Sequence, residues 1–525
     1  MIRRRDLAGL LALAAAPGMA RAQSRQVLNI GVATTPNSAD PHFYAFQPNL
    51  NLSLHVFSRL VERDARLRPV PGLALSWTPV GDRIWEFKLR PNVKWHDGRD
   101  FTADDVVFTI GRVPTVPNSP GGFAGYVRPV TRVEVVDPLT IRMHTDGPHP
   151  SLPNDLTFVA IISRHAGEGA TTEDYNSGKA CIGTGPYRLG RYQPGDVVEL
   201  IRNDVWFGPR EPWERVNLRV IPQAGARSAA LLAGDVDIID EVSSNDVLAL
   251  QRGRGVSVAE TQSTRLVFLQ PNFSRTGALP DVTDAEGQPL AANPFLDLRV
   301  RRALSLAIDR SALVARVMEG RGTPSGQWLP EGFYSSNPRV GVPEVDAAAA
   351  RRLLAEAGYP QGFRLVLSTP TDRFANDSRI AQAVAQMWTR IGVTTVVNAL
   401  PYAAFSARAS RQEYGMWLHS WASSTGEASY FLNTVAHTVD PAKRAGAHNW
   451  SRYSNPALDA LTERSFTLLN PDEREVVLQE AVQMVADDLP MLPLFHLSLL
   501  WGLRQGLSFE PNMSGYTAAM TIRRA

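Results

Sequence analysis

The spacing of apolar residues changes character along the chain. Between residues 56 and 181 short alternating segments dominate, and within 84–90 the apolar Trp85, Phe87 and Leu89 alternate with the charged Glu86, Lys88 and Arg90. Such alternation is typical of a strand with one buried and one solvated face. Residues 132–136 and 140–144 show the pattern of two strands joined by a short turn. This part of the chain is predicted to form a β-rich subdomain.

From about residue 295 onward, helical and strand patterns follow one another. Asp346 stands where a helix-capping residue is expected, and three strands alternate with two helices after it. The predicted strands are 363–368, 393–399 and 414–420, and the predicted helices are 376–391 and 402–411. This βαβαβ succession implies parallel strands with right-handed crossovers. The predicted fold class is α/β.

Two polar segments follow strands of this α/β region. They are Thr371–Asp377 and Ser420–Glu427, and ligands of α/β sheets lie at the carboxyl ends of strands. Arg373 would offer a planar guanidinium to a ligand carboxylate. Trp421 would offer apolar area and one donor. The alternatives are that Arg373 is a solvated loop residue and that Trp421 belongs to the core.

The composition is that of a globular protein with more than one core. A chain of 525 residues is expected to form two or three domains. Apolar residues make up 44% and charged residues 20% of the chain, which is ordinary for a soluble protein. The net charge is only +2 and the basic residues are scattered, so no nucleic-acid partner is predicted.

The N-terminus has the pattern of an export signal. A basic stretch at 3–5 precedes an apolar stretch at 7–16, and Ala20-Arg-Ala22 fits a cleavage site that leaves Gln23 first. The apolar stretch is too short for a stable membrane anchor. Arg4-Arg5 also resembles a twin-arginine signal, and an ordinary Sec signal is the alternative. We expect a periplasmic protein with a signal peptide at 1–22.

Cysteine is almost absent from the chain. Cys181 is the single cysteine, so no intrachain disulfide can form, and no cysteine follows the signal to carry a lipid. We therefore expect a protein that is not a lipoprotein and that is stabilised by packing alone.

Motifs for catalysis and metal binding are missing from the sequence. It contains no Gly-x-Ser-x-Gly, no His-Glu-x-x-His and no phosphate-binding Gly-x-x-x-x-Gly-Lys. Gly183–Tyr187 reads as a tight turn, because Pro186 prevents a helix from starting there. The ten histidines lack ligand spacing, and His42, His55 and His96 are expected to be surface or capped residues. We predict no enzyme activity, no metal and no cofactor.

Short motifs spread over nearly the whole mature chain match one known family. They are Gly72–Trp77, Trp85–Arg90, Val93–Gly98, Phe101–Val106, Gly183–Tyr187, Arg299–Leu304, Ala307–Arg310, and Tyr453–Pro456 with Asp459. Through them the chain resembles the family 5 extracellular solute-binding proteins of ABC importers, the peptide- and nickel-binding group. The dipeptide- and glutathione-binding members are the most similar in pattern.

The resemblance implies a two-lobed periplasmic binding protein of type II, with an extra β-rich subdomain in lobe 1. Ligand would be enclosed between the lobes as the population shifts toward a closed state. A separate subunit hydrolyses ATP, so the implied partners are a solute and the permease subunits, and we expect a monomer. The implied limits are 27–55, 182–270 and 505–525 for lobe 1, 56–181 for the subdomain, and 271–504 for lobe 2.

The resemblance also implies three ligand-binding segments. They correspond to Ala45-Phe46-Gln47, Arg373-Phe374-Ala375 and Trp421-Ala422-Ser423-Ser424. In dipeptide-binding members the last position is an aspartate that pairs with the peptide's amino group. Ser424 cannot replace that carboxylate, and the nearest acid is Glu427, in a run that resembles the loop of glutathione-binding members. Carboxylate recognition is therefore expected, and recognition of an ordinary dipeptide is in doubt.

The resulting expectation is a receptor that captures a peptide-like or amino-acid-derived carboxylate and delivers it to a permease. Two alternatives stay open at this point. One is a nickel-chelate or haem receptor of the same family, and the other is a secreted peptide hydrolase.

Overall fold

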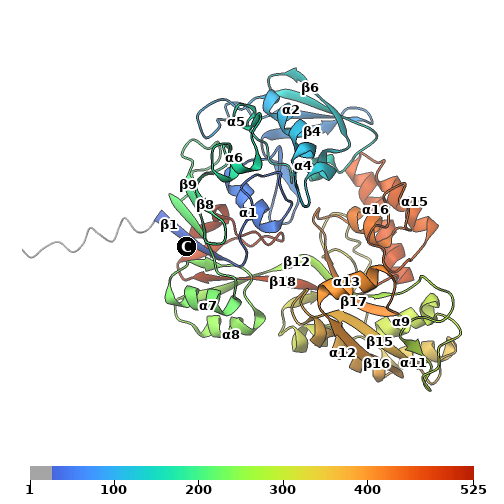
Figure 1. Ribbon diagram of the computed structural model, residues 1–525. Coiled ribbons are helices and arrows are strands. Elements are labelled where there is room, and N and C mark those ends of the chain that lie inside the picture. Colours follow the sequence, from blue (N-terminus) through green and yellow to red (C-terminus); the bar gives the residue numbers. More distant parts are fainter. Residues whose placement is uncertain (1–25) are drawn as a thin grey trace, which may run out of the picture.

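The computed structural model describes residues 26–525, and the expected signal peptide lies outside these residues. The described chain forms two lobes joined by long strands (Figure 1). A mixed sheet of twelve described strands runs through both lobes. Its main path is β13 (Val282–Thr283), β15 (Phe363–Pro370), β17 (Met416–Ala422), β12 (Val256–Pro271), β18 (Leu492–Arg504), β11 (Ile238–Ile239), β1 (Val27–Val32), β10 (Arg215–Val220), β9 (Val197–Arg202) and β8 (Tyr187–Gln193), with β14 (Gly322–Pro324) on β18 and β16 (Val393–Leu400) on β15.

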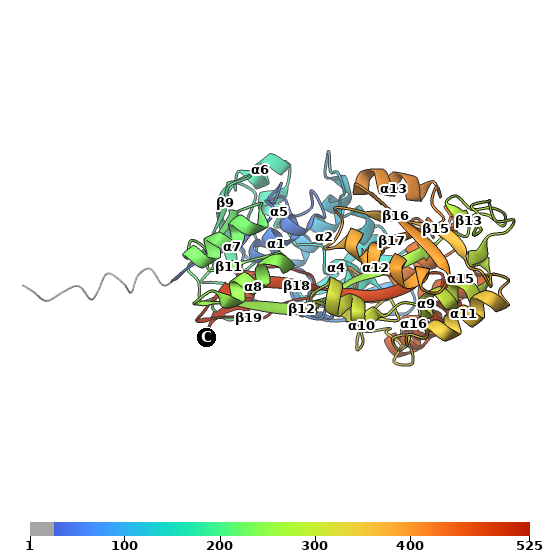
Figure 2. The same ribbon diagram turned by 90° about the horizontal axis from the view of Figure 1, so that it is seen from below.

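The antiparallel pair β12–β18 forms the connection between the lobes. Its first half pairs Gln262 with Ser498, and after a bulge Leu266 pairs with His496. Both strands run from one lobe into the other (Figures 1 and 2). The bulge lies between residues 256–259, which pack in lobe 1, and residues 266–269, which pack in lobe 2. A bulge bends the strand and re-aims its side chains, and here it redirects the residues from Ser263 to Arg265. The hinge is therefore a locally irregular two-stranded ribbon.

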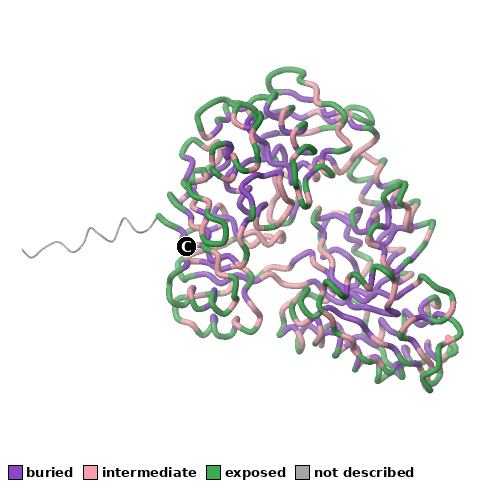
Figure 3. Tube along the Cα trace, in the orientation of Figure 1, coloured by how far each residue is buried: buried purple, intermediate pink, exposed green. Residues whose placement is uncertain are grey.

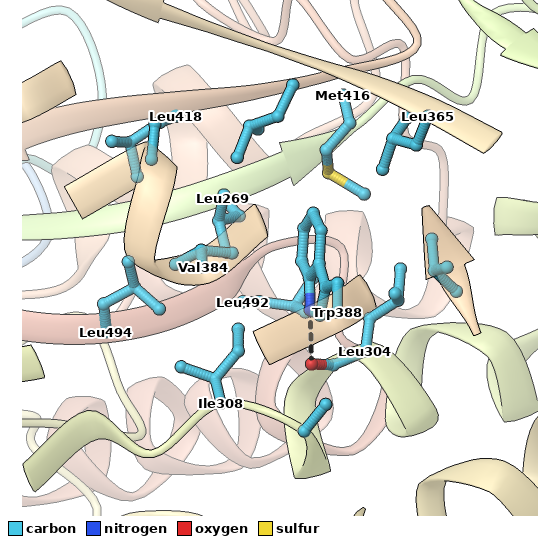
Figure 4. Packing of buried hydrophobic residues seen from close by; sticks show 14 of the residues in the cluster. Leu269, Leu304, Ile308, Leu365, Val384, Trp388, Met416, Leu418, Leu492 and Leu494 are labelled. Carbon is cyan, nitrogen blue, oxygen red and sulfur yellow. Dashed lines mark hydrogen bonds between the residues drawn. The ribbon is translucent and has the colours of Figure 1, made fainter. Parts of the chain in front are cut away.

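Lobe 2 contains the predicted βαβαβ unit. β15 pairs in parallel with both β16 and β17, and α12 (Asp377–Thr389) and α13 (Tyr402–Ser410) follow β15 and β16. Trp388 of α12 is 0% exposed and donates its indole N–H to the Leu304 carbonyl at 2.9 Å (Figure 4). A buried indole is stable when its N–H has a partner. The prediction of parallel pairing is confirmed.

The β-rich region forms its own antiparallel sheet, in the order β4 (Ala74–Pro79), β5 (Ile84–Leu89), β7 (Thr140–Thr145) and β6 (Val130–Asp137). Every second residue of β5 is buried, as the alternation predicts. α2 (Ala103–Arg112) begins with a capping box between Thr102 and Asp105. Within each lobe and in this subdomain the interior strands are buried and the outer loops exposed (Figure 3). The residue limits given above for the lobes stay a prediction.

The remaining elements complete the two lobes. The helices are α1 (Gln47–Val56), α3 (Ala124–Val127), α4 (Leu152–Leu156), α5 (Arg164–Gly167), α6 (Thr172–Asn176), α7 (Ala224–Ala233), α8 (Ser244–Arg252), α9 (Leu298–Leu306), α10 (Arg310–Ala312), α11 (Ala347–Glu356), α14 (Ser429–Phe431), α15 (Pro456–Ser465) and α16 (Pro471–Asp488). The short strands are β2 (Val61–Arg63), β3 (Pro69–Pro71), β19 (Leu507–Phe509) and β20 (Ile522–Arg524). Over residues 26–525, no helix combines the length and apolarity needed to cross a membrane.

The glycine-containing segment 183–187 packs against the end of α1. A Cβ added at Gly183 would lie 1.8 Å from the Val56 carbonyl oxygen, so the chains approach too closely for any side chain. His96 accepts the Gly183 N–H at 3.1 Å. His42 and His55 are 0% exposed and hydrogen-bonded to backbone groups. His42 and His55 are therefore buried and not surface residues, whereas His96 is half-buried and hydrogen-bonded to the 183–187 segment.

The start of α11 provides a stability test. Asp346 accepts the Ala349 N–H at 2.8 Å as its N-cap. We expect Asp346→Ala to lower the free energy of unfolding by about 0.5–2 kcal/mol, since an orphan donor of the first turn loses its partner. Urea unfolding measures the change. Glu344→Ala, an exposed site just before the helix, should leave the unfolding midpoint in place, and equal losses in both variants would contradict a capping role.

Candidate ligand-binding site

The loop after β15 holds Arg373 at the surface of lobe 2. Its backbone N–H donates to Asp377 at 3.2 Å, and the neighbouring Asp372 accepts the backbone N–H of Tyr402 at 2.7 Å. The Arg373 guanidinium lies 4.8 Å from the centre of the Tyr402 ring. This cation–π contact orients the guanidinium without using its N–H donors. Arg373 is exposed, so those donors are accessible.

An aromatic and histidine cluster lies beside this loop. His419 of β17 stacks on Trp450 at 5.3 Å and on Tyr402 at 6.4 Å. Trp421 makes an edge contact with His419 at 6.1 Å and lies 4.6 Å from His448. Tyr402 belongs to this cluster and also makes the cation–π contact with Arg373. The cluster therefore links the Arg373 loop to the Trp421 segment. The structure thus brings together two of the three predicted segments.

A second arginine borders the same cluster. Arg265, at the end of the bulge in β12, is the Cα partner of Ala422 in β17, and its guanidinium donates to Ser420 Oγ at 3.4 Å. Burial, with the positive charge of Arg373 acting in the same direction, lowers the pKa of Arg265 to about 10. Among the described residues, no carboxylate forms an ion pair with Arg265 or Arg373.

His419 is neutral in this setting. Burial lowers its pKa to about 3, with the charges of Arg373 and Arg265 acting in the same direction. It is 3% exposed, and neither ring nitrogen has a hydrogen-bond partner within residues 26–525. A buried polar group without a partner is costly, and such groups in native structures often mark a place where water or ligand binds. The cluster therefore retains hydrogen-bonding capacity next to the two arginines.

The loop after β17 is fixed by internal bonds. Ser423 is buried, accepts the Gly426 N–H at 3.0 Å and donates to the Glu427 carbonyl at 3.2 Å. Thr264 of β12 donates to the Ser423 carbonyl at 2.8 Å. Ala422 is half-buried and Ser424 is exposed. The hydroxyl of Ser423 is thus occupied within the loop, whereas that of Ser424 faces solvent.

Glu427 is paired with a residue of lobe 2. It is 3% exposed, and Arg474 donates to its two oxygens at 2.8 Å each. Burial acts to raise the pKa of Glu427, but the Arg474 charge and its hydrogen bonds, with one from Ser429, outweigh burial and lower that pKa. The carboxylate is therefore ionised and already compensated by a guanidinium.

A third arginine comes from the β-rich subdomain. Arg63 donates to the Ser424 carbonyl at 2.6 Å and lies 4.0 Å from the centre of the Phe158 ring. Burial lowers the pKa of Arg63 to about 10, so it is charged at neutral pH. Ser424, which stands where dipeptide-type receptors would have an acid, is thus in contact with a cation. The contact between Arg63 and Ser424 also joins the subdomain to lobe 2.

The segment Ala45-Phe46-Gln47 lies in lobe 1, at the start of α1. Ala45 donates its N–H to the Gly121 carbonyl at 2.9 Å, Phe46 stacks on Tyr44 at 5.4 Å, and Gln47 donates to the Gly515 carbonyl at 2.9 Å. Within the described part of the chain, no hydrogen bond joins this segment to the Arg373 or Trp421 loops. The structure leaves it on the opposite lobe.

Two other predicted residues lie next to Arg373 in sequence but do not contribute a polar side chain to the site. Phe374 is half-buried and packs against the core of lobe 2, and Ala375 is exposed next to it. The prediction from sequence did not include Arg265, Tyr402 or Arg63. Arg265 directly precedes the apolar run Leu266–Leu269. A charged residue next to a buried strand segment was the only local feature that could have identified it as a site residue.

Metal ligands do not gather anywhere in residues 26–525: no three His, Cys, Asp or Glu residues are placed to share an ion. His419 and His448 lie near each other, but aromatic rings surround His419. That no metal binds stays a prediction.

Comparison with known proteins agrees with the two-lobed architecture. The family model described as bacterial extracellular solute-binding proteins, family 5 Middle, matches residues 68–443. Heme-binding protein A of Haemophilus influenzae is 28% identical, over 85% of this chain and 82% of the relative. The dipeptide-binding protein of Escherichia coli is 24% identical, over 86% of each chain.

A solved structure extends the similarity to the fold. The structure of HbpA2 from Haemophilus parasuis has a TM-score of 0.81 and 25% identity, covering 95% of this chain and all of that one. The family match spans more than half of the chain, and the relatives are binding proteins. The chain therefore belongs to family 5 of the bacterial extracellular solute-binding proteins.

Proposed function

We propose that the protein is the periplasmic receptor of an ABC importer for a peptide-like or amino-acid-derived acid, with Arg373 as the carboxylate anchor. The observation that carries this proposal is the Arg373 guanidinium, which is oriented over Tyr402 and has no acidic partner among the described residues. A guanidinium held in this way is organised before ligand arrives, so little ordering opposes binding. A carboxylate fits its planar fork of donors.

The other residues of the site divide between the two lobes. Trp421 forms a wall beside His448, and Phe46 and Gln47 would meet the ligand from lobe 1 when the lobes close. Ser424 and the backbone of Ala45, Ala422 and Ala375 complete the edges. Phe374 and Ser423 support the loops from within, since both are engaged by lobe 2.

Glu427 is not proposed as an ammonium partner, because Arg474 already compensates its charge. Arg63 next to Ser424 adds a cation where an ammonium would have to bind. Two like charges in a partly buried site repel each other. The proposed ligand is therefore an acid whose amino group is absent, blocked or directed elsewhere.

Membership of the family supports a proposal for the partners and the location of this protein. The proposed partners are the permease subunits of an importer, which would accept the closed, loaded receptor, and the proposed location is the periplasm, where the receptor acts as a monomer. The signal peptide, its Sec or twin-arginine type and the absence of lipid belong to this proposal and concern residues before 26.

A thermal-shift comparison tests carboxylate recognition. We expect N-acetyl-Ala-Ala and N-acetyl-Ala-Glu to raise the melting temperature, while the carboxamide of N-acetyl-Ala-Ala, which carries no carboxylate, does not. A ligand that binds only the folded state at 100 times its Kd adds about 2.7 kcal/mol of stability. Equal shifts from acids and carboxamides would contradict the proposal, as would a lack of any shift from peptide acids at millimolar concentration.

The alternatives predict different readouts. A nickel-chelate or haem receptor would carry metal after purification or change the absorbance of added hemin. A hydrolase would convert the peptides into fragments that chromatography separates. We expect no hydrolysis, because His419 has no hydrogen-bonded serine among the described residues. We expect no metal held by several side chains, because the described residues hold no cluster of three metal ligands. Haem needs only one or two axial ligands, so the hemin titration alone decides that alternative.

A further inference from the structure

The cationic side of the site contains more positive charge than one carboxylate requires. Arg265 approaches the end of β17 from β12, through its contact with Ser420. Arg373 approaches the same strand from the loop after β15, through Tyr402 and His419. The two guanidinia therefore flank the carboxyl end of one strand, although they are more than a hundred residues apart in sequence.

Building on the proposed function, we propose that Arg265 is a second anion-binding residue and that the ligand carries two acidic groups. Arg373 would hold one acid and Arg265 the other, with the wall of Trp421 and His419 between them. A bidentate carboxylate uses the two-N–H fork of a single guanidinium. Two separate guanidinia thus match a diacid better than a monoacid.

The electrostatics of the free protein support this assignment. Arg265 remains charged at neutral pH, since its lowered pKa is still about 10. Among the described residues no ion pair offsets the mutual repulsion of the two arginines: Asp377 accepts the backbone N–H of Arg373, and Glu427 is paired with Arg474. A ligand with one negative charge would relieve part of this repulsion, and a ligand with two would relieve more of it.

His419 supplies a second, independent observation. The ring is almost fully buried between Tyr402 and Trp450, and both ring nitrogens lack a partner in the described chain. A neutral imidazole has one N–H donor to offer. An anionic group bound between the arginines would give that donor an acceptor, which the protein itself does not provide.

Calorimetry with matched ligands tests the proposal. The probes are N-acetyl-Ala-Glu, a diacid, and N-acetyl-Ala-Gln, a monoacid of the same size. We expect the diacid to bind the wild-type protein at least tenfold more tightly. In Arg265→Gln this preference should disappear, while the affinity for the monoacid changes less than about twofold. Arg379→Gln, an exposed arginine of α12, should keep the preference.

The outcomes separate this proposal from the proposed function. If neither peptide acid binds, carboxylate recognition itself is wrong. If both peptides bind wild type equally well and Arg265→Gln changes nothing, Arg373 stands as the single anchor and the second position is wrong. Arg265→Lys keeps the charge without the planar fork and should show an intermediate preference. Melting curves without ligand check that each variant is folded.

Discussion

Arg373→Ala should weaken binding of a peptide acid by tenfold or more. The substitution removes a charge-assisted contact, worth about 1.5–3 kcal/mol, and each 1.4 kcal/mol corresponds to about a tenfold change in Kd. It leaves the loop intact, because the loop is held by backbone bonds at Asp372 and Asp377 and not by the guanidinium. Isothermal titration with N-acetyl-Ala-Ala, the acid from the thermal-shift panel, measures the effect.

The control for this variant is another arginine of the same segment. Arg379 is exposed, and among the described residues its side chain forms one hydrogen bond, to Asn376 at 3.3 Å, so Arg379→Ala should retain wild-type affinity. Arg373→Lys keeps a positive charge and loses the planar fork, and its affinity should fall between those of wild type and Arg373→Ala. An unchanged Kd in Arg373→Ala would remove this residue from the site.

Arg474→Met should cause the largest loss of stability. The substitution leaves Glu427 buried without its counter-charge, and breaking a buried pair in this way costs about 3–5 kcal/mol. The pair fixes the loop after β17, since Glu427 follows directly on the hydrogen bonds of Ser423 and Gly426. Ligand affinity should fall as well, because the Trp421 segment loses its support. Urea unfolding and titration measure the two effects.

The dependence on pH distinguishes the buried pair from ordinary packing. The pKa of Glu427 is lowered in the folded protein, so its contribution to stability is present above the unfolded pKa of about 4.3 and is lost as pH falls through the folded value. In Arg474→Met, burial without a partner should raise that pKa instead. The variant should then gain stability as pH falls toward 5, while the wild type does not.

A double variant provides the control. In the double variant Glu427→Leu with Arg474→Met, no charge is left buried. Its loss in the free energy of unfolding should therefore be smaller than the sum of the losses in the two single variants. Strictly additive losses would show that the two residues act independently, contrary to the bidentate geometry at 2.8 Å.

Much of lobe 2 and part of the β-rich subdomain were predictable from sequence, because their elements depend on local patterns. The cap at Asp346 in lobe 2 and the alternation of β5 in the β-rich subdomain are both local features. The same holds for the parallel order of β16, β15 and β17, since the connecting helices impose it. Arg373 was found because it follows β15, and Trp421 because it lies at the carboxyl end of β17, directly beyond the predicted strand end.

The hinge strands and half of the site were not predictable in this way. β12 is apolar at its C-terminal end but polar in its middle, because its middle residues lie between the cores of the two lobes. No single hydrophobic periodicity therefore runs along the strand. Arg265 gains its neighbours only through the pairing of β12 with β17. Glu427 was proposed as an ammonium partner because Arg474, 47 residues away, cannot be seen as its partner from sequence.

The ribbon of β12 and β18 has a mechanical consequence. Two hydrogen-bonded strands resist stretching along their length. They already have a right-handed twist, and a change in this twist deforms the ribbon without stretching it. A small turn at the bulge between Gln262 and Leu266 therefore grows into a large displacement at the far ends of the molecule. A membrane complex that touches only those outer surfaces could distinguish a loaded from an empty receptor by their separation, without ever contacting the cargo.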